Sequence, residues 1–141
     1  MAGVMSTAEV EVKASVGKVW EALTDPEIIA KYFFGSRVET DWRPGSPITW
    51  KGEWEGHAYE DKGRVLDVVP NRLLKVTHFS PLAGLPDRPE NYHNLTFELE
   101  QRGAATRVRL TQDNNKDEAE AERSTQNWTT MLEGLKKTVE G

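Results

Sequence analysis

Residues 15–27 read SVGKVWEALTDPE and contain two helix starts in close succession. Ser15 places a side-chain oxygen where it can accept a hydrogen bond from the free amides of a first helical turn. Asp25 followed by Pro26 repeats the signal, because the missing N–H of proline is harmless in a first turn. Apolar side chains follow each start at helical spacing. The stretch therefore predicts two short helices in series, the second of which ends near Gly35.

Strand patterns flank this pair of helices on both sides. Residues 7–13 alternate apolar and polar side chains with a period of two, as a half-buried strand requires. From Arg37 to Asn114 the same period recurs in segments bounded by proline, glycine and asparagine, which predicts about six further strands. The inward face of the first two segments is predicted to carry Val38, Thr40, Trp42, Ile48, Trp50 and Trp54. Residues 80–91 contain three prolines and a glycine, and their length is typical of a functional loop such as a lid.

Residues 117–139 carry the pattern of a long amphipathic helix. The acidic stretch 117–122 complements the positive end of a helix dipole. The apolar face that follows consists of Trp128, Met131, Leu132, Leu135 and Val139. The order of elements predicts an α+β helix-grip fold, in which two short helices and a long C-terminal helix pack across a curved antiparallel sheet of about seven strands. Residues 1–141 are predicted to form one domain of this kind.

Composition narrows the classes of function. The 141 residues carry a net charge of -5, with 18 Lys and Arg against 23 Asp and Glu, which argues against a nucleic-acid-binding surface. The sequence contains no cysteine, no secretion signal and no apolar run long enough to span a membrane. We therefore expect a soluble, cytoplasmic protein without a nucleic-acid or membrane partner. No cofactor is predicted.

Several motifs resemble those of a known superfamily. Residues 19–27, VWEALTDPE, are similar to the helix-to-helix signature of the START-like (SRPBCC) superfamily, which includes the birch-pollen allergen and polyketide cyclases. Three further motifs resemble one branch of this superfamily, the branch related to the C-terminal domain of the heat-shock-chaperone ATPase activator. They are GRVLDVVP at 63–70 with RLL at 72–74, ATRVRLT at 105–111, and Asn127-Trp128 with Leu132 and Leu135. These motifs cover nearly the whole chain. The resemblance implies a helix-grip fold that forms a cavity for a ligand.

Two departures limit what the resemblance implies. The chaperone activator uses an additional N-terminal domain, for which a START-like unit filling 141 residues leaves no room, so chaperone activation is not expected. His78 stands near the place where many relatives carry a bulky aromatic side chain. The inner wall of the cavity is therefore expected to be more polar than usual.

A curved sheet and a straight helix do not touch along their full length, so the side chains between them either fill the gap or line a cavity. The residues predicted to bind a ligand there are Trp50, Trp54, Val76, His78, His93, Phe97, Trp128, Met131 and Leu135. An apolar and aromatic set with two polar points is typical of ligand pockets. The competing interpretation is ordinary core packing, which we favour for Leu135 and weigh evenly against ligand binding for Trp50 and Trp128.

Candidates for catalysis are few. The three histidines lack the spacing of a metal site, so no metal is predicted. His78 is the one candidate general base, since histidine titrates near neutral pH, and Tyr92 or Glu98 would assist it if they reach the cavity. The acids Glu53, Glu55, Glu60 and Asp61 cluster along one hairpin. With Lys51, Lys62 and Arg64 as neighbours, they are predicted to form a solvated, charge-mixed edge.

These features favour a protein that binds a small apolar or aromatic molecule in an internal cavity, rather than an enzyme. The first alternative is an enzyme of the cyclase or hydratase type that uses the same cavity. The second is a chaperone-associated interaction domain that binds another protein through its long helix or a sheet edge. Nothing in the sequence specifies a protein partner.

Overall fold

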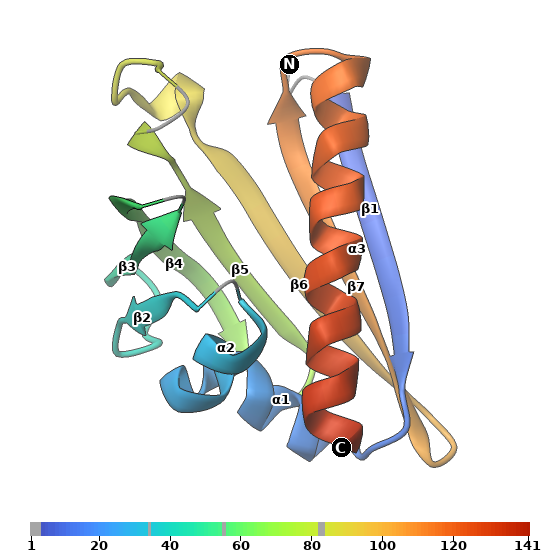
Figure 1. Cartoon of the computed structure of the whole chain (residues 1–141). Helices are drawn as coiled ribbons and strands as arrows, with labels where there is room; N and C mark the ends of the chain where they lie inside the picture. Colours follow the sequence, from blue (N-terminus) through green and yellow to red (C-terminus); the bar gives the residue numbers. More distant parts are fainter. Residues whose placement is uncertain (1–3, 34, 55, 82–83) are drawn as a thin grey trace.

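The computed structural model in Figure 1 describes residues 4–33, 35–54, 56–81 and 84–141. In chain order its elements are β1 (Val4–Val12), α1 (Val16–Thr24), α2 (Pro26–Tyr32), β2 (Arg37–Glu39), β3 (Pro47–Trp54), β4 (His57–Val69), β5 (Leu73–His78), the 3-10 helix η2 (Pro89–Asn91), β6 (His93–Arg102), β7 (Ala105–Asn115) and α3 (Glu118–Glu140). The predicted order of strand, two short helices, six strands and long helix is confirmed. Among the described residues, no helix combines the length and apolar character that crossing a membrane would require.

The helices begin where their capping residues place them. Ser15 and Asp25 each accept a hydrogen bond from an amide of the following first turn, at 3.4 and 3.0 Å. Asp117 accepts one from the Glu120 amide at the start of α3, at 2.8 Å. Each contact satisfies an amide that has no partner within its own helix. α2 ends at Tyr32, slightly before the predicted end.

The seven strands form one antiparallel sheet in the order β1-β7-β6-β5-β4-β3-β2. β1 pairs with β7, which lies far from it in the sequence, and the other strands pair with their neighbours along the chain. α3 packs on β1 and β7, whereas α1 and α2 lie beside the C-terminal part of α3 (Figure 1). The architecture is therefore the predicted α+β helix grip.

The extents of β2 and β4 differ from what the residue pattern suggests. β2 ends at Glu39 rather than continuing to Trp42, whose backbone φ of 61° is incompatible with a strand. β4 begins at His57, well before its completely buried residue Val65. The early part of β4 is polar, so it lacks the clear alternation that would have revealed it. A turn at Gly56, with φ of 81°, joins it to β3.

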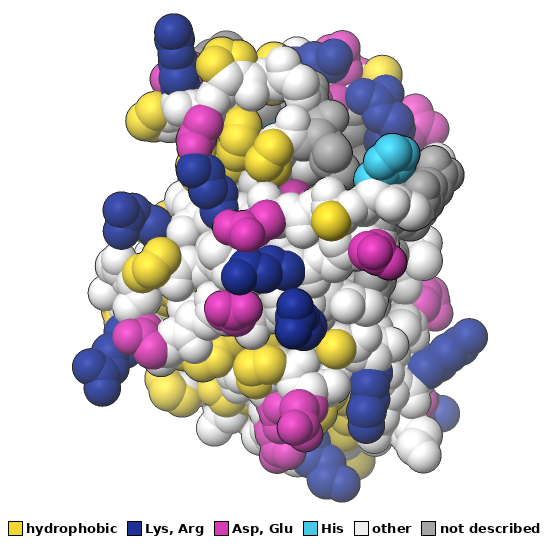
Figure 2. All heavy atoms as spheres, turned by 60° about the vertical axis from the view of Figure 1, so that its left-hand side comes forward, with side chains coloured by type: hydrophobic (Ala, Val, Ile, Leu, Met, Phe, Trp, Pro, Cys, Tyr) yellow, Lys and Arg dark blue, Asp and Glu magenta, His cyan; other side chains and the backbone are white. Residues whose placement is uncertain are grey.

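The side of the sheet formed by β2, β3 and β4 carries charges of both signs. Figure 2 shows basic and acidic side chains interspersed on the face that this view brings forward. Lys51 on β3 lies 3.3 Å from Glu39 on β2 and 4.0 Å from Glu60 on β4, so ion pairs cross the strands. Mixed charge of this kind discourages pairing with another sheet.

The core is filled where α1, α2 and the C-terminal half of α3 cover the sheet. A residual void of only about 30 Å³ is lined there by side chains that include Trp50, Val76, Phe97 and Met131. All four are more than nine-tenths buried. At Gly134 a Cβ would lie 3.3 Å from the Cβ of Tyr32, so the missing side chain lets α3 pack closely against α2.

Candidate functional site

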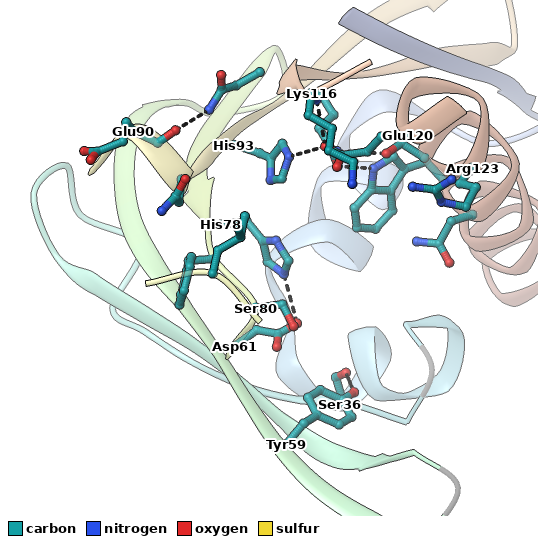
Figure 3. Close-up of a pocket in the computed structure, with 18 of the residues that line it drawn as sticks. Ser36, Tyr59, Asp61, His78, Ser80, Glu90, His93, Lys116, Glu120 and Arg123 are labelled. Carbon is teal, nitrogen blue, oxygen red and sulfur yellow. Dashed lines mark hydrogen bonds and ion pairs between the residues drawn. The ribbon is translucent and has the colours of Figure 1, made fainter. Parts of the chain in front are cut away.

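A pocket of about 710 Å³ opens beside this filled core. It lies between the N-terminal half of α3, the strands β4 to β7 and the loop of residues 80–91 (Figure 3). Its aromatic wall includes Phe33, Tyr59, Phe79 and Trp128, and polar side chains line much of the remainder. The volume falls within the range of about 300–1,000 Å³ that is usual for small-molecule pockets.

Two histidine–carboxylate pairs lie on the pocket wall. His78 and His93 are cross-strand partners at the ends of β5 and β6. His78 Nε2 lies 3.0 Å from Asp61 Oδ2, and His93 Nε2 lies 3.1 Å from Glu120 Oε1. A carboxylate only accepts hydrogen bonds, so Nε2 is the protonated nitrogen in each pair and both rings are held in place. Within the described residues, no three His, Asp or Glu side chains come together as a metal site would require.

Asp61 faces the pocket because of the alternation of β4. Val65 is completely buried, and side chains two and four residues before it share its face of the strand. Asp61 is also the cross-strand partner of the buried Trp50. The prediction that Asp61 belongs to a solvated edge is therefore wrong, since its side chain is only 16% exposed. Counting back by two from Val65 would have found it.

A buried polar network holds Trp128 against the pocket. Its indole N–H donates to Gln112 Oε1 at 2.8 Å. Gln112 Nε2 donates in turn to Asn115 Oδ1 at 2.7 Å and to Ser124 Oγ at 2.9 Å. Asn115 Nδ2 donates to the Val4 carbonyl at 2.8 Å, which ties the network to β1. Because these donors are already satisfied, the indole ring is a preformed wall.

Ionic and aromatic contacts fasten the loop of residues 80–91 to the sheet. Lys62 on β4 forms an ion pair with Asp87, whose other oxygen accepts a hydrogen bond from the Tyr92 hydroxyl at 2.6 Å. The Tyr92 ring stacks on Phe79, with the centroids 5.0 Å apart. Hydrogen bonds from Lys62 and Tyr92 hold the pKa of the Asp87 carboxyl below its ordinary value, and Asp87 raises the pKa of Lys62. These contacts fix the wall that the loop contributes.

The residues predicted to bind a ligand divide into separate groups. His78, His93 and Trp128 line the large pocket. Trp50, Val76, Phe97 and Met131 surround the 30 Å³ void instead. Leu135 is completely buried in the core, in keeping with the packing interpretation favoured for it. The side chain of Trp54 lies outside the described part of the chain.

The expected helpers of His78 do not meet it. The Tyr92 hydroxyl is engaged by Asp87, and Glu98 is exposed on the face of β6 opposite to the buried Phe97. The side chain that bonds to His78 is that of Asp61 instead. Sequence reasoning also missed Glu120, which looked like an ordinary acid of a first helical turn.

A curved antiparallel sheet with a long C-terminal helix packed across it and a pocket between the two defines the START-like class of proteins. Residues 13–140 match the model of the family described as Activator of Hsp90 ATPase homolog 1-like protein, and the chain belongs to this family. The resemblance noted in the sequence is thereby confirmed.

Solved structures share the fold of this chain. The solution structure of ChR145 from Cytophaga hutchinsonii is 50% identical, with a TM-score of 0.86 over 99% of this chain and 96% of that one. The Aha1 dimer from Colwellia psychrerythraea is 23% identical, with a TM-score of 0.74 over 97% and 96% of the two chains. CalU16 from Micromonospora echinospora is 19% identical, with a TM-score of 0.75 over 99% and 85%. The last two show a shared fold alone, and no curated protein matches the chain.

Proposed function

We propose that this chain binds a small molecule with an aromatic or apolar body in the pocket between α3 and the sheet. The observation that carries the proposal is a pocket of about 710 Å³ with Phe33, Tyr59, Phe79 and Trp128 in its wall. Ligand pockets are typically concave and apolar, with a few polar groups that fix the orientation of the ligand. Membership of the family is compatible with ligand binding.

The fixed positions of the wall residues support this proposal. Gln112 holds the Trp128 indole, and carboxylates hold the rings of His78 and His93. Binding therefore does not have to order these side chains, which removes an entropic cost of up to about 1.5 kcal/mol for each rotamer-rich side chain. Ring faces held in this way suit a flat ligand.

The proposal is tested by blocking the pocket. N-phenyl-1-naphthylamine, a neutral apolar probe, is titrated by calorimetry into wild type and Asn127→Trp, because Asn127 is exposed on α3 and lines the pocket. The added indole should weaken binding about tenfold or more, a loss of roughly 1.4 kcal/mol. The matched control is Gln126→Trp, at the neighbouring exposed position outside the pocket, which should bind like wild type. Absence of binding, or equal binding by both variants, would contradict the proposal.

A second candidate, a proton-transferring enzyme of the cyclase or hydratase type, is favoured by one contact. The 3.0 Å bond to Asp61 leaves Nδ1 of His78 as a nitrogen that can accept a proton. The ring also makes an edge contact with Trp50, with centroids 5.0 Å apart, which restrains it further. Positioned bases of this kind act in proton transfer without large movement.

His78→Gln separates this candidate from simple binding. Both proteins are incubated with small molecules retained from the native host, and the products are analysed by mass spectrometry. Conversion by wild type but not by His78→Gln, with the fold of the variant intact by circular dichroism, supports catalysis. Recovery of the same unchanged molecule from both proteins means that the chain only binds it.

A further inference from the structure

One buried acceptor in the pocket has no donor. Asp61 Oδ2 bonds to His78, but Oδ1 has no hydrogen-bond partner, and among the described residues it is the one buried side-chain polar atom in this condition. A buried carboxylate oxygen without a donor is unfavourable, because it loses its hydrogen bonds to water without replacement. The carboxylate therefore has an unused capacity inside the pocket.

Nearby hydroxyls do not supply the missing donor. The hydroxyls of Ser36 and Tyr59 bond to each other at 2.5 Å. Figure 3 shows Ser80 close to Asp61 on the same side of the pocket, yet no hydrogen bond joins them. A hydroxyl or N–H group of a molecule bound in the pocket would supply a donor at this position.

Two cations line another part of the pocket. Lys116 and Arg123 come from the beginning of α3 and the residues just before it, on the side away from Asp61 in Figure 3. Both are exposed, and neither forms a salt bridge with a described residue. Glu120, which lies between them in sequence, is engaged by His93. A guanidinium and an ammonium that line a pocket are suited to a carboxylate.

We infer that the ligand is an aromatic acid that also carries a hydroxyl or N–H donor. Its donor bonds to Asp61 Oδ1, its ring lies against Trp128 and Phe79, and its acid group meets Arg123 and Lys116. A cationic ligand fits less well, because Lys116 and Arg123 line the same pocket and would repel it. This inference rests on the proposed binding function and specifies the class of molecule.

Three related probes separate the two ends of the ligand. Wild type is titrated by calorimetry with 3-(4-hydroxyphenyl)propanoate, with 3-phenylpropanoate, which lacks the hydroxyl, and with 4-ethylphenol, which lacks the acid. Loss of the hydroxyl should weaken binding about 10- to 100-fold, as expected for a hydrogen bond to a charged group. Loss of the acid should weaken it less, about two- to fivefold, because the cations are exposed and screened by salt.

Protein variants then assign each effect to a residue. In Asp61→Leu the hydroxyl should give no advantage. If that variant is unfolded by circular dichroism, Asp61→Asn, which keeps the shape but not the charge, should reduce the advantage to a few-fold. Arg123→Gln should remove most of the preference for the acid, whereas Lys137→Gln, an exposed cation on α3 outside the pocket, should keep it.

The outcomes distinguish this inference from the proposal beneath it. If the hydroxyl makes no difference in wild type, or its full advantage survives in the Asp61 variants, the inference is overturned. The binding function still stands in that case, provided that N-phenyl-1-naphthylamine binding remains sensitive to Asn127→Trp. If none of the three related probes binds while N-phenyl-1-naphthylamine does, the inference about the ligand class fails and the proposed binding function stands.

Discussion

The two ends of the space between α3 and the sheet are built differently. Along the C-terminal half of the helix, Leu135 is completely buried, and Met131, Trp50 and Phe97 line a void of only about 30 Å³. At the N-terminal end the same helix borders a pocket of about 710 Å³. α1 and α2 cover the sheet at the first end, whereas a loop of residues 80–91 covers the second.

The difference shows that a helix-grip fold can separate stability from binding along one helix. The filled end buries apolar side chains completely and supplies hydrophobic stabilisation. The open end contains polar side chains whose hydrogen bonds are mostly made within the protein, so it can remain hollow without a large penalty. Substitutions at the two ends should therefore affect different measurements.

The largest expected contrast compares two positions one helical turn apart on α3. Met131→Ala removes a buried side chain from the filled end and should lower the free energy of unfolding by about 2–5 kcal/mol. Asn127 lines the open pocket, so Asn127→Ala should change the free energy of unfolding by less than about 0.5 kcal/mol. Urea unfolding at neutral pH measures both. Similar values for the two variants would mean that the ends are not packed differently.

A second prediction concerns the strand pair that carries Asp61 and His78. A Cβ at Gly63 would lie 1.8 Å from the Thr77 carbonyl oxygen, so Gly63→Ala must push β4 away from β5. We expect a loss of about 1–3 kcal/mol in the free energy of unfolding. Gly17→Ala is the control, since no atom lies within 4 Å of its new methyl in α1, and it should stabilise by about 0.5–1 kcal/mol. Destabilisation by both changes would show that crowding is not the cause.

The smallest expected effect concerns the attachment of the loop. The pKa of Asp87 is held below its ordinary value of 3.8. The stabilisation that the ionised carboxylate gives to the folded protein is therefore fully present above pH 3.8 and is lost as the pH falls through the lowered pKa. At neutral pH, Asp87→Asn should imitate the acid state and speed hydrogen exchange at the amides of Asn91 and Tyr92. Asp67→Asn, an exposed acid elsewhere on the sheet, is the control. Unchanged exchange in Asp87→Asn would show that the ion pair does not hold the loop.

The sequence predicted the order of the elements because its signals are local. Caps such as Ser15 and Asp25, and alternation within strands, act over a few residues and need no knowledge of distant partners. Trp42 shows the limit of such patterns, since an even position three residues beyond the end of β2 suggested a strand that its backbone does not form.

The site was less predictable because it depends on pairing between distant segments. His93 and Glu120 meet only after β6 and α3 are placed, and nothing near either residue indicates the other. A bulge in β4 adds a further obstacle, because the pairing changes register between Val65 and Asp67. Counting by two from Val68 therefore places Asp61 on the wrong face, whereas counting from Val65 places it correctly.

The pairing of β1 with β7 also determines when this protein can fold. Val4 pairs with Asn115 and Val12 with Thr106, and the Lys13 amide donates to Glu140 in the last turn of α3 at 2.7 Å. On the ribosome, β1 therefore has no neighbour in the sheet until residues 105–115 have emerged. The nascent chain must carry β1 unpaired while the residues between β1 and β7 are made, and the sheet is completed only after β7 is available.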